Sequence, residues 1–357
     1  MSNYSFSLVT LEDLEKIKYD AGFPSNQYQW IQNWFSVFEK VENNIIGHRK
    51  KPYIITAFEG DRLVAIIPLV KLYRTYFKRI KIEFLEFLGQ QWSNLGNDIL
   101  ILEDLDESFT DELILWIKKN ISFHFLFFKY LPKNSILSSK FKMFHYAGAP
   151  FIDVASYNNY EEFSKQVYTR KFREDLRRTW RRVKRDGYEV SICREEISDS
   201  NLQQIRKIAK SKEVDGKSSL YGESEKEQFH LRMYECFPSH VVFIKFNDQP
   251  VAYGTSIDWN GERIGIDAAF DRNYRRYGAG IHCLDSTIQN SFKDRKEKLS
   301  FGLGLDTYKF QFTDKIEQYF MCFDFKYRLK SLLALPYFLY RLKKEDRMVA
   351  KKLEKVK

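Results

Sequence analysis

The segment from Ile264 to Lys309 constrains the fold most, because it predicts four elements in a fixed order. Apolar residues alternate with polar and small ones over 264–270, which is typical of a strand. Two glycines, Gly278 and Gly280, follow a turn. An apolar stripe then recurs at helical spacings, at Ile281, Leu284 and Ile288. A short apolar run at 298–301 completes the order strand, glycine turn, helix, strand, which indicates an α/β (α+β) fold.

The glycine turn predicts a binding site for a phosphorylated ligand. Glycines at the start of a helix let the backbone approach a ligand closely, and the first free N–H groups of the helix favour an anion. Arg275 and Arg276, just before the turn, add guanidinium groups that pair well with phosphate oxygens. A tight structural turn is the alternative, but the position between two strands favours a phosphorylated cofactor.

The spacing of these residues resembles a known cofactor loop. Arg275-x-x-Gly278-x-Gly280 is similar to the acyl-coenzyme A pyrophosphate loop of the GNAT acyltransferases, which lies between the fourth strand and the following helix of that fold. The resemblance implies that the cofactor is acetyl-CoA or another acyl-CoA. The residues expected to bind it are Arg275, Arg276, Gly278, Ala279 and Gly280.

Other parts of the chain resemble the GNAT branch named for cellulose-biosynthesis acetyltransferases. They are the pattern Gly304-x-Asp306-x-Tyr308-Lys309, the basic segment 171–187, Trp30 with Trp34, Pro68-Leu69 and Phe87-Leu88-Gly89. Two departures affect the expected substrate contacts rather than the fold. Ser300 stands where the branch often has an aspartate, and the segment 211–214 lacks a tryptophan that the branch tends to have.

Two similar hairpins indicate an internal duplication. In each, an apolar strand, at 53–58 or 241–246, meets a short polar turn and a second strand that opens with Val-Ala. A helical stretch precedes each hairpin. The first copy has no Arg-x-x-Gly-x-Gly spacing, so only the second copy is expected to bind the cofactor.

We therefore predict tandem GNAT-like domains, each with a mixed, mostly antiparallel twisted sheet flanked by helices. Tandem GNAT enzymes and the Fem-type peptidoglycan transferases that the chain resembles are built in this way. The predicted boundaries are 1–152 for a first domain without a cofactor loop, 153–330 for the cofactor-binding domain and 331–357 for a basic C-terminal helix or tail. A length of 357 residues also favours two domains.

The segment from Thr169 to Gly187 predicts a basic helix with one apolar seam. The seam residues recur at spacings of four and three, and they are Phe172, Leu176, Trp180 and Val183. Arg173, Arg177 and Arg181 form a row on the same helix. Two compatible interpretations stay open. The arginines are a solvated face of a helix packed on the core, or they line a channel for an anionic substrate.

Composition limits the partners and the compartment. A net charge of +10 favours anionic partners, and a hydrophobic content of 44% excludes a disordered chain. The four cysteines lie far apart, so we expect reduced core residues. The sequence shows no signal-peptide pattern, and its apolar stretches are short, so we expect a cytoplasmic protein. The basic tail can dock on the protein body or make a peripheral contact with the inner membrane face.

Acyl transfer to an amine needs a proton acceptor, a donor to the oxyanion and a proton for the leaving thiolate. The resemblance implies that a backbone N–H near 267–269 polarises the thioester carbonyl and that Tyr308 is the general acid. Asp267 shares its predicted strand face with Gly265 and Ala269, so it is the candidate proton acceptor. The alternative for Asp267 is an exposed strand aspartate.

We expect an N-acyltransferase that acts on an amino group of a small molecule, amino sugar or surface-glycan precursor. Only the resemblance implies the glycan class. The expected substrate contacts are Arg173, Arg177 and Lys309, with a helix-capping role as the alternative for Lys309, and His282 is expected to be structural.

Two other functions stay open. One is a Fem-like transferase that takes aminoacyl groups from tRNA, although nucleic acid is not the expected partner. The other is a non-catalytic GNAT-like module in an envelope polysaccharide assembly complex.

Overall fold

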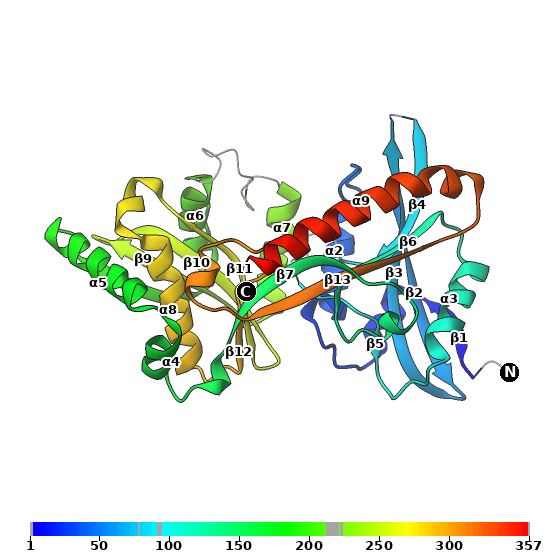
Figure 1. Cartoon of the computed structure of the whole chain (residues 1–357), viewed down its shortest axis with the longest axis horizontal. Coiled ribbons are helices and arrows are strands. Elements are labelled where there is room, and N and C mark those ends of the chain that lie inside the picture. Colours follow the sequence, from blue (N-terminus) through cyan, green and yellow to red (C-terminus); the bar gives the residue numbers. More distant parts are fainter. Residues whose placement is uncertain (1–2, 78, 91–94, 212–220, 222–223, 356–357) are drawn as a thin grey trace. The chain divides into compact units, whose positions relative to one another are not determined.

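The computed structural model describes residues 3–77, 79–90, 95–211, 221 and 224–355. The chain divides into two compact units (Figure 1). The first unit contains Met1–Gly148 and Gln318–Lys357, and the second contains Ala149–Glu317. Residues 212–214, part of the segment that lacks the tryptophan of the cellulose-biosynthesis branch, lie outside the described residues.

The first unit is built on a mixed sheet. In spatial order its strands are β1 (Ser5–Val9), β2 (His48–Glu59), β3 (Arg62–Tyr76), β4 (Ile80–Phe87), β6 (Phe125–Pro132) and β13 (Ile316–Phe325). Neighbouring strands are antiparallel except β4 and β6, which are parallel. The short β5 (Leu100–Ile101) pairs with β3. The helices are α1 (Leu11–Lys16), α2 (Tyr28–Phe38), α3 (Phe109–Asn120) and α9 (Leu329–Glu354).

The core of the first unit lies between α3 and one face of its sheet. Apolar residues of α3 recur at helical spacing, and Leu113 and Ile117 are fully buried there. They pack in one cluster with Leu85 of β4 and with Leu126 and Phe128 of β6. The apolar stripe of α3 and the buried strand β6 thus form the centre of this core.

The second unit repeats this plan. In spatial order its strands are β8 (Val190–Glu196), β9 (Ser239–Phe246), β10 (Gln249–Trp259), β11 (Glu262–Phe270), β12 (Lys298–Ser300) and β7 (Phe144–Asp153). Neighbours are antiparallel except β11 and β12, which are parallel. The helices are α4 (Tyr160–Val167), α5 (Arg170–Arg185), α6 (Asp199–Ala209), α7 (Ser224–Cys236) and α8 (Ala279–Lys293).

The two sheets have the same order of strand directions, with three antiparallel pairs, one parallel pair and a last antiparallel pair. The predicted hairpins are β2–β3 and β9–β10, at equivalent places. In each unit two helices lie in sequence between the first two strands, and one helix connects the two parallel strands. The fold is a tandem repeat of one mixed α/β unit, as the sequence predicted.

The observed boundaries of the two units differ from the predicted ones, because β13 lies late in the chain but belongs to the sheet of the first unit. β13 pairs with β6 through residues 319–325, so the second unit ends at Glu317 rather than at the predicted residue 330, and the chain then returns to the first unit. The segment 331–357 was predicted as a separate basic helix or tail; its residues 331–354 form most of α9, which groups with the first unit. The division near residue 148 lies close to the predicted boundary at 152.

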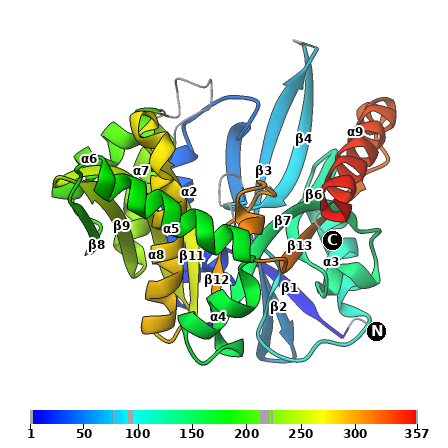
Figure 2. The ribbon, with the colours of Figure 1, turned by 60° about the vertical axis from the view of Figure 1, so that its left-hand side comes forward.

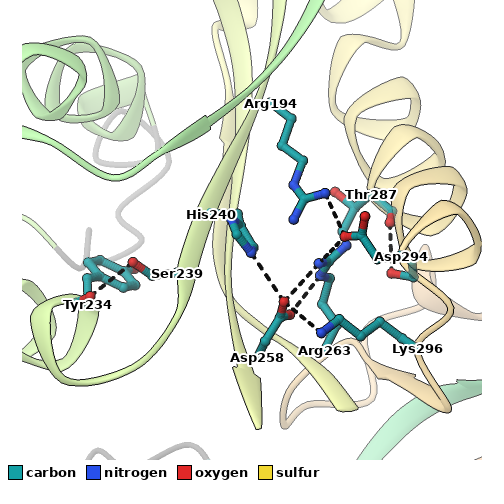
Figure 3. A network of polar contacts seen from close by, with 10 residues as sticks. Arg194, Tyr234, Ser239, His240, Asp258, Arg263, Thr287, Asp294 and Lys296 are labelled. Carbon is teal, nitrogen blue, oxygen red and sulfur yellow. Dashed lines mark hydrogen bonds and ion pairs between the residues drawn. The ribbon is translucent and has the colours of Figure 1, made fainter. Parts of the chain in front are cut away.

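A buried ion network fixes one end of the second unit (Figure 3). Arg263 of β11 is 1% exposed and forms a bidentate pair with Asp258 at 2.9 and 3.0 Å. It also contacts Asp294, beyond the end of α8, at 2.6 Å. Lys296 contacts Asp258 at 2.9 Å. Burial alone would raise the pKa of the Asp258 carboxyl, but hydrogen bonds with His240, Arg263 and Lys296 outweigh it and lower that pKa. The network therefore ties β10, β11 and the end of α8 together.

The four cysteines are free thiols, in agreement with the reduced state expected from the sequence. Cys283 and Cys322 are buried, but Cys236 is exposed and Cys193 is half-buried. The expectation that all four lie in the core is therefore wrong for Cys236. Across the described ranges, no helix combines the length and apolarity that a bilayer span requires.

Candidate active site

The site begins where β11 and β12 separate. The two strands pair only over Glu262–Ile264 and Lys298–Ser300. On its other edge, β11 pairs with β10 up to Phe270, with a β-bulge next to Thr255. No strand among the described residues pairs with the β12-facing edge of β11 beyond Ile264. Unpaired peptide groups on a strand edge suit an extended ligand that contains amides.

The predicted glycine turn lies between the end of β11 and the start of α8. Gly278 has φ +67°, in the left-handed region that favours glycine, and it immediately precedes α8. A Cβ atom on Gly280 would lie 2.9 Å from a ring carbon of Phe270, so a larger residue would displace the ring. Within the described chain, no side chain caps the start of α8. The amides of its first turn are therefore available to an anion.

The basic helix α5 packs on this turn (Figure 2). Thr179 would lie 3.6 Å from a Cβ atom at Gly278. The guanidinium of Arg182 donates a hydrogen bond to the carbonyl oxygen of Arg276 at 2.7 Å. The predicted apolar seam is confirmed, since Phe172, Leu176, Trp180 and Val183 belong to two buried clusters of the second unit. One function of α5 is thus to fix the glycine turn.

The two arginines of the turn differ in their surroundings. Arg276 pairs with Asp186 at 3.1 Å and also donates a hydrogen bond to the hydroxyl of Tyr277. Arg275 is exposed, and no hydrogen bond or ion pair in the described chain engages its guanidinium. Arg275 is therefore the arginine that is available to a phosphate, whereas Arg276 stabilises the turn.

Asp267 is half-buried and forms hydrogen bonds, so it is not a simple exposed strand aspartate. Tyr253 of the neighbouring strand β10 is fully buried and donates a hydrogen bond from its hydroxyl to the Asp267 carboxylate. The hydroxyl of Thr255 lies 3.2 Å from both the N–H and the carbonyl oxygen of Asp267. Burial and the Asp267 charge both raise the pKa of the Tyr253 phenol. Tyr253 is thus a permanent donor to this carboxylate.

Tyr308 is 39% exposed, and its phenol experiences the charge of the Asp267 carboxylate. Burial raises the pKa of its phenol to about 12, with smaller contributions from the charges of Asp306 and Asp267. The phenol is therefore protonated at neutral pH and able to donate a proton. The structure thus brings Tyr308 and Asp267 within electrostatic range of each other.

Lys309 lies next to Tyr308 but is 5% exposed. Its ammonium donates hydrogen bonds to the carbonyl oxygens of Gly302, Leu303 and Gly304, at 3.0 to 3.1 Å. Burial lowers its pKa to about 8. All three N–H donors are engaged within the loop, and the predicted contact with a substrate phosphate stays a prediction. Lys309 closes the loop that positions Tyr308.

Comparison with known families agrees with this geometry. Residues 170–310 match the family described as "Acetyltransferase (GNAT) domain". The second unit contains a GNAT domain. The match begins at α5 and ends just after Lys309, so it includes the glycine turn, Asp267 and Tyr308.

Two solved structures resemble the tandem arrangement over most of the chain. The crystal structure of FemX has a TM-score of 0.59 and 11% sequence identity, covering 93% of this chain and 99% of its own. A conserved protein of unknown function from Bacteroides thetaiotaomicron VPI-5482 has a TM-score of 0.53 and 12% identity, covering 89% of this chain and 99% of its own. These identities establish the shared fold alone. No curated protein matches the sequence.

Two arginines of α5, Arg173 and Arg177, were predicted to contact the substrate, and their surroundings in the GNAT domain differ. Arg173 donates hydrogen bonds to the carbonyl oxygens of Ser164 and Lys165, both at 3.1 Å, and to that of Tyr168. Nη1 of Arg173 therefore caps the end of α4, and the predicted substrate contact of this arginine stays a prediction. Arg177 is exposed and has no hydrogen bond or ion pair to the rest of the described chain, so its predicted role stays a prediction.

His282 of the GNAT domain is structural, as expected. Its ring is 2% exposed, stacks on Trp180 at 3.8 Å between centroids, and has Nε2 2.8 Å from the hydroxyl of Thr179. Burial lowers the pKa of this imidazole to about 4. A neutral ring therefore joins α8 to α5 beside the glycine turn.

Tyr253 and Thr255 of the GNAT domain were not among the site residues predicted from the sequence. They alternate on β10, and the antiparallel register places Thr255 opposite Asp267. The alternation was visible in the sequence, but the register that selects Asp267 as their partner was not. A bulge beside this pair also breaks the strict alternation that grouped Gly265 with Asp267.

Proposed function

We propose that this protein is an acyl-CoA-dependent N-acyltransferase that acts on an amino group, and that the donor is acetyl-CoA or another acyl-CoA. The observation that supports it is the uncapped start of α8, which follows Gly278 and lies beside the free guanidinium of Arg275. Amide groups, a helix N-terminus and one guanidinium together suit a pyrophosphate. The unpaired edge of β11 suits the amides of a pantetheine arm.

The residues around Asp267 suit the chemistry of acyl transfer. Bound acyl-CoA supplies a thioester, whose C–S bond is exchanged for a C–N bond to the amine. A backbone N–H of β11 near 267–269 donates to the thioester oxygen as charge develops there. Asp267 accepts the proton that the amine loses, directly or through water, and Tyr308 gives its proton to the departing sulfur. The Asp267 proton and the Tyr308 phenolate then re-equilibrate with solvent, so protons balance over a turnover.

The acceptor class is the finer part of the proposal. An amino sugar or surface-glycan precursor follows from the resemblance to the cellulose-biosynthesis branch. The row of exposed arginines on α5, Arg177 among them, suits an acceptor with a negative charge. A screen of neutral and acidic amino sugars with one acyl-CoA tests this class.

Calorimetric titration with acetyl-CoA and with adenosine 3′,5′-bisphosphate tests the cofactor. We expect both ligands to bind, and binding to be lost in Gly278→Glu, which strains the left-handed turn and adds a carboxylate to it. Gly60→Glu is the matched control, because Gly60 has a similar φ of +60° and open space around it, in the β2–β3 turn. Retained binding in Gly278→Glu would show that the cofactor loop is misassigned.

The alternative with a supporting observation is aminoacyl transfer from tRNA. The fold similarity to FemX and the exposed arginines of α5 favour it. It predicts salt-sensitive binding of tRNA, which Arg177→Glu weakens, and no heat of binding with either coenzyme ligand. If neither ligand class binds to folded protein, a non-catalytic module is the remaining function.

A further inference from the structure

Exposed apolar side chains gather on two segments of the first unit. One is the tip of the β3–β4 hairpin, which projects from the unit (Figure 1), and the other is the first half of α9. Phe77, at the tip, is 78% exposed, and Leu333, on α9, is 74% exposed. The other members are Ile80, Leu329, Leu332, Tyr337 and Tyr340. We call these seven residues the apolar surface.

The two segments touch, so the apolar surface is continuous. The rings of Phe77 and Tyr337 lie 6.2 Å apart between centroids. Tyr76, next to the tip, packs edge-on against Tyr337 at 5.9 Å and against the buried Phe338 at 5.4 Å. These contacts hold the hairpin on α9 while leaving Phe77 and Leu333 in solvent.

Basic residues surround the apolar surface. Residues 327–344 and 63–82 contain no aspartate or glutamate. Exposed cations in them include Arg79, Lys81 and Lys330. None of these three has a carboxylate partner in the part of the chain that the structure describes. The surface therefore combines apolar and aromatic side chains with uncompensated positive charge.

We propose that the apolar surface docks on an anionic lipid bilayer. Aromatic and aliphatic side chains that enter the headgroup region, together with lysines and arginines beside them, give peripheral binding that depends on anionic lipid. A second copy of this chain would bring two sets of cations face to face. Nucleic acid would be attracted by the cations but would leave Leu329 and Leu333 in water. Of these three partners, an anionic bilayer is the one that matches both the positive charge and the exposed apolar side chains.

This proposal does not depend on the enzymatic one. Every residue of the apolar surface belongs to the first unit, whereas the glycine turn, Asp267 and Tyr308 belong to the second. Membrane docking would place the protein where acceptors attached to lipid are found. An enzyme with a soluble acceptor would dock in the same way.

Co-sedimentation of the full chain with vesicles tests the proposal. We expect binding to vesicles of phosphatidylcholine with phosphatidylglycerol, weak binding to phosphatidylcholine alone, and loss of binding at high salt. The double variant Phe77→Ser, Leu333→Asn should bind at least about tenfold more weakly. Leu115→Asn is the matched control, since Leu115 is 67% exposed on α3, outside the apolar surface. Both substituted side chains are exposed, and thermal unfolding checks the fold of each variant.

Separate variants test the charge. Lys330→Glu with Arg79→Glu should weaken binding to anionic vesicles and reduce its dependence on salt. Absence of vesicle binding by folded protein would overturn the proposal. Equal binding of the Phe77→Ser, Leu333→Asn variant would also overturn it, as would concentration-dependent self-association that this variant abolishes without any vesicle binding. The last result would identify a second copy as the partner.

Discussion

The hydroxyl of Tyr253 on β10 donates a hydrogen bond to the carboxylate of Asp267 on β11. The two residues lie 14 apart in the chain, and the hairpin register brings them together. Because Tyr253 is fully buried, its hydroxyl has this carboxylate as its local acceptor. The pair orients the group to which we assign the amine proton.

The first prediction concerns this pair. Asp267→Asn should lower kcat by about 10² to 10⁴, because the amide cannot accept the proton, while acyl-CoA affinity is retained. Tyr253→Phe should lower kcat less, since the carboxylate stays but loses a donor. Steady-state kinetics with calorimetry measures both effects. Tyr160→Phe is the control, because it removes a similar 2.7 Å bond to Asp285 away from the site. An equal kcat loss in the control would indicate a general packing effect.

The second prediction concerns the general acid. Tyr308→Phe should lower kcat by about 10² and leave the KM for acyl-CoA nearly unchanged, because the phenol acts on the leaving sulfur. Its raised pKa keeps it protonated at the pH of a normal assay. Tyr327→Phe, at an 84% exposed tyrosine, should have no effect. A Tyr308→Phe enzyme with normal kcat would exclude this role.

The third prediction concerns the ammonium of Lys309. Lys309→Met leaves three carbonyl oxygens without their donor, so we expect a loss of about 1 to 3 kcal/mol in the free energy of unfolding. A lower kcat should accompany it, because the loop no longer positions Tyr308. Chemical denaturation measures the first effect. Lys315→Met, which breaks an exposed pair with Asp153, should cost less than about 1 kcal/mol.

The fourth prediction is a pH dependence of stability. The pKa of His282 is about 4 in the folded protein and ordinary in the unfolded chain. Between about pH 6.5 and 4 the unfolded state therefore binds a proton that the folded state does not, so stability falls as pH falls. The loss amounts to about 3 kcal/mol at most and ends below about pH 4, where both states are protonated. Unfolding curves across this range should be flatter for His282→Gln than for the wild type. Identical slopes would contradict the assignment.

The fifth prediction concerns the buried ion network. Arg263→Met leaves Asp258 and Asp294 short of a buried cation, and we expect a loss of about 3 to 5 kcal/mol in the free energy of unfolding. Arg185→Met, at a 73% exposed arginine paired with Asp186, should cost about 1 kcal/mol or less. Urea titration of both variants measures the loss in the free energy of unfolding, which should be larger for the buried pair than for the surface pair. Similar costs would mean that water reaches the Arg263 guanidinium.

Much of the second unit was predictable because its signals are local. The alternation over 264–270, the left-handed Gly278 and the stripe of α8 each depend on neighbouring residues, and all three appear where the sequence placed them. The repeated hairpins were predictable for the same reason, because turn chemistry and strand alternation act over a few residues.

The roles of single charged residues were less predictable. The sequence treats Arg275 and Arg276 alike, yet Asp186, about ninety positions earlier, engages only Arg276. Lys309 and Arg173 were expected at the substrate, but backbone carbonyl oxygens engage both. Several backbone carbonyl oxygens converge on one ammonium or guanidinium only when loops and helix ends pack together. No local sequence pattern therefore predicts such a contact.

The sequence by itself determined the repeated α/β unit, the position of the glycine turn and its likeness to the acyl-CoA loop of the GNAT acyltransferases. These follow from backbone periodicity and glycine chemistry, which the chain specifies residue by residue. The tertiary structure decided that β13 joins the first unit, that Tyr253 orients Asp267 and that Arg275 stays free. Each of these outcomes depends on strand register or on packing between residues distant in the chain, and such pairings are set only when the whole sheet assembles.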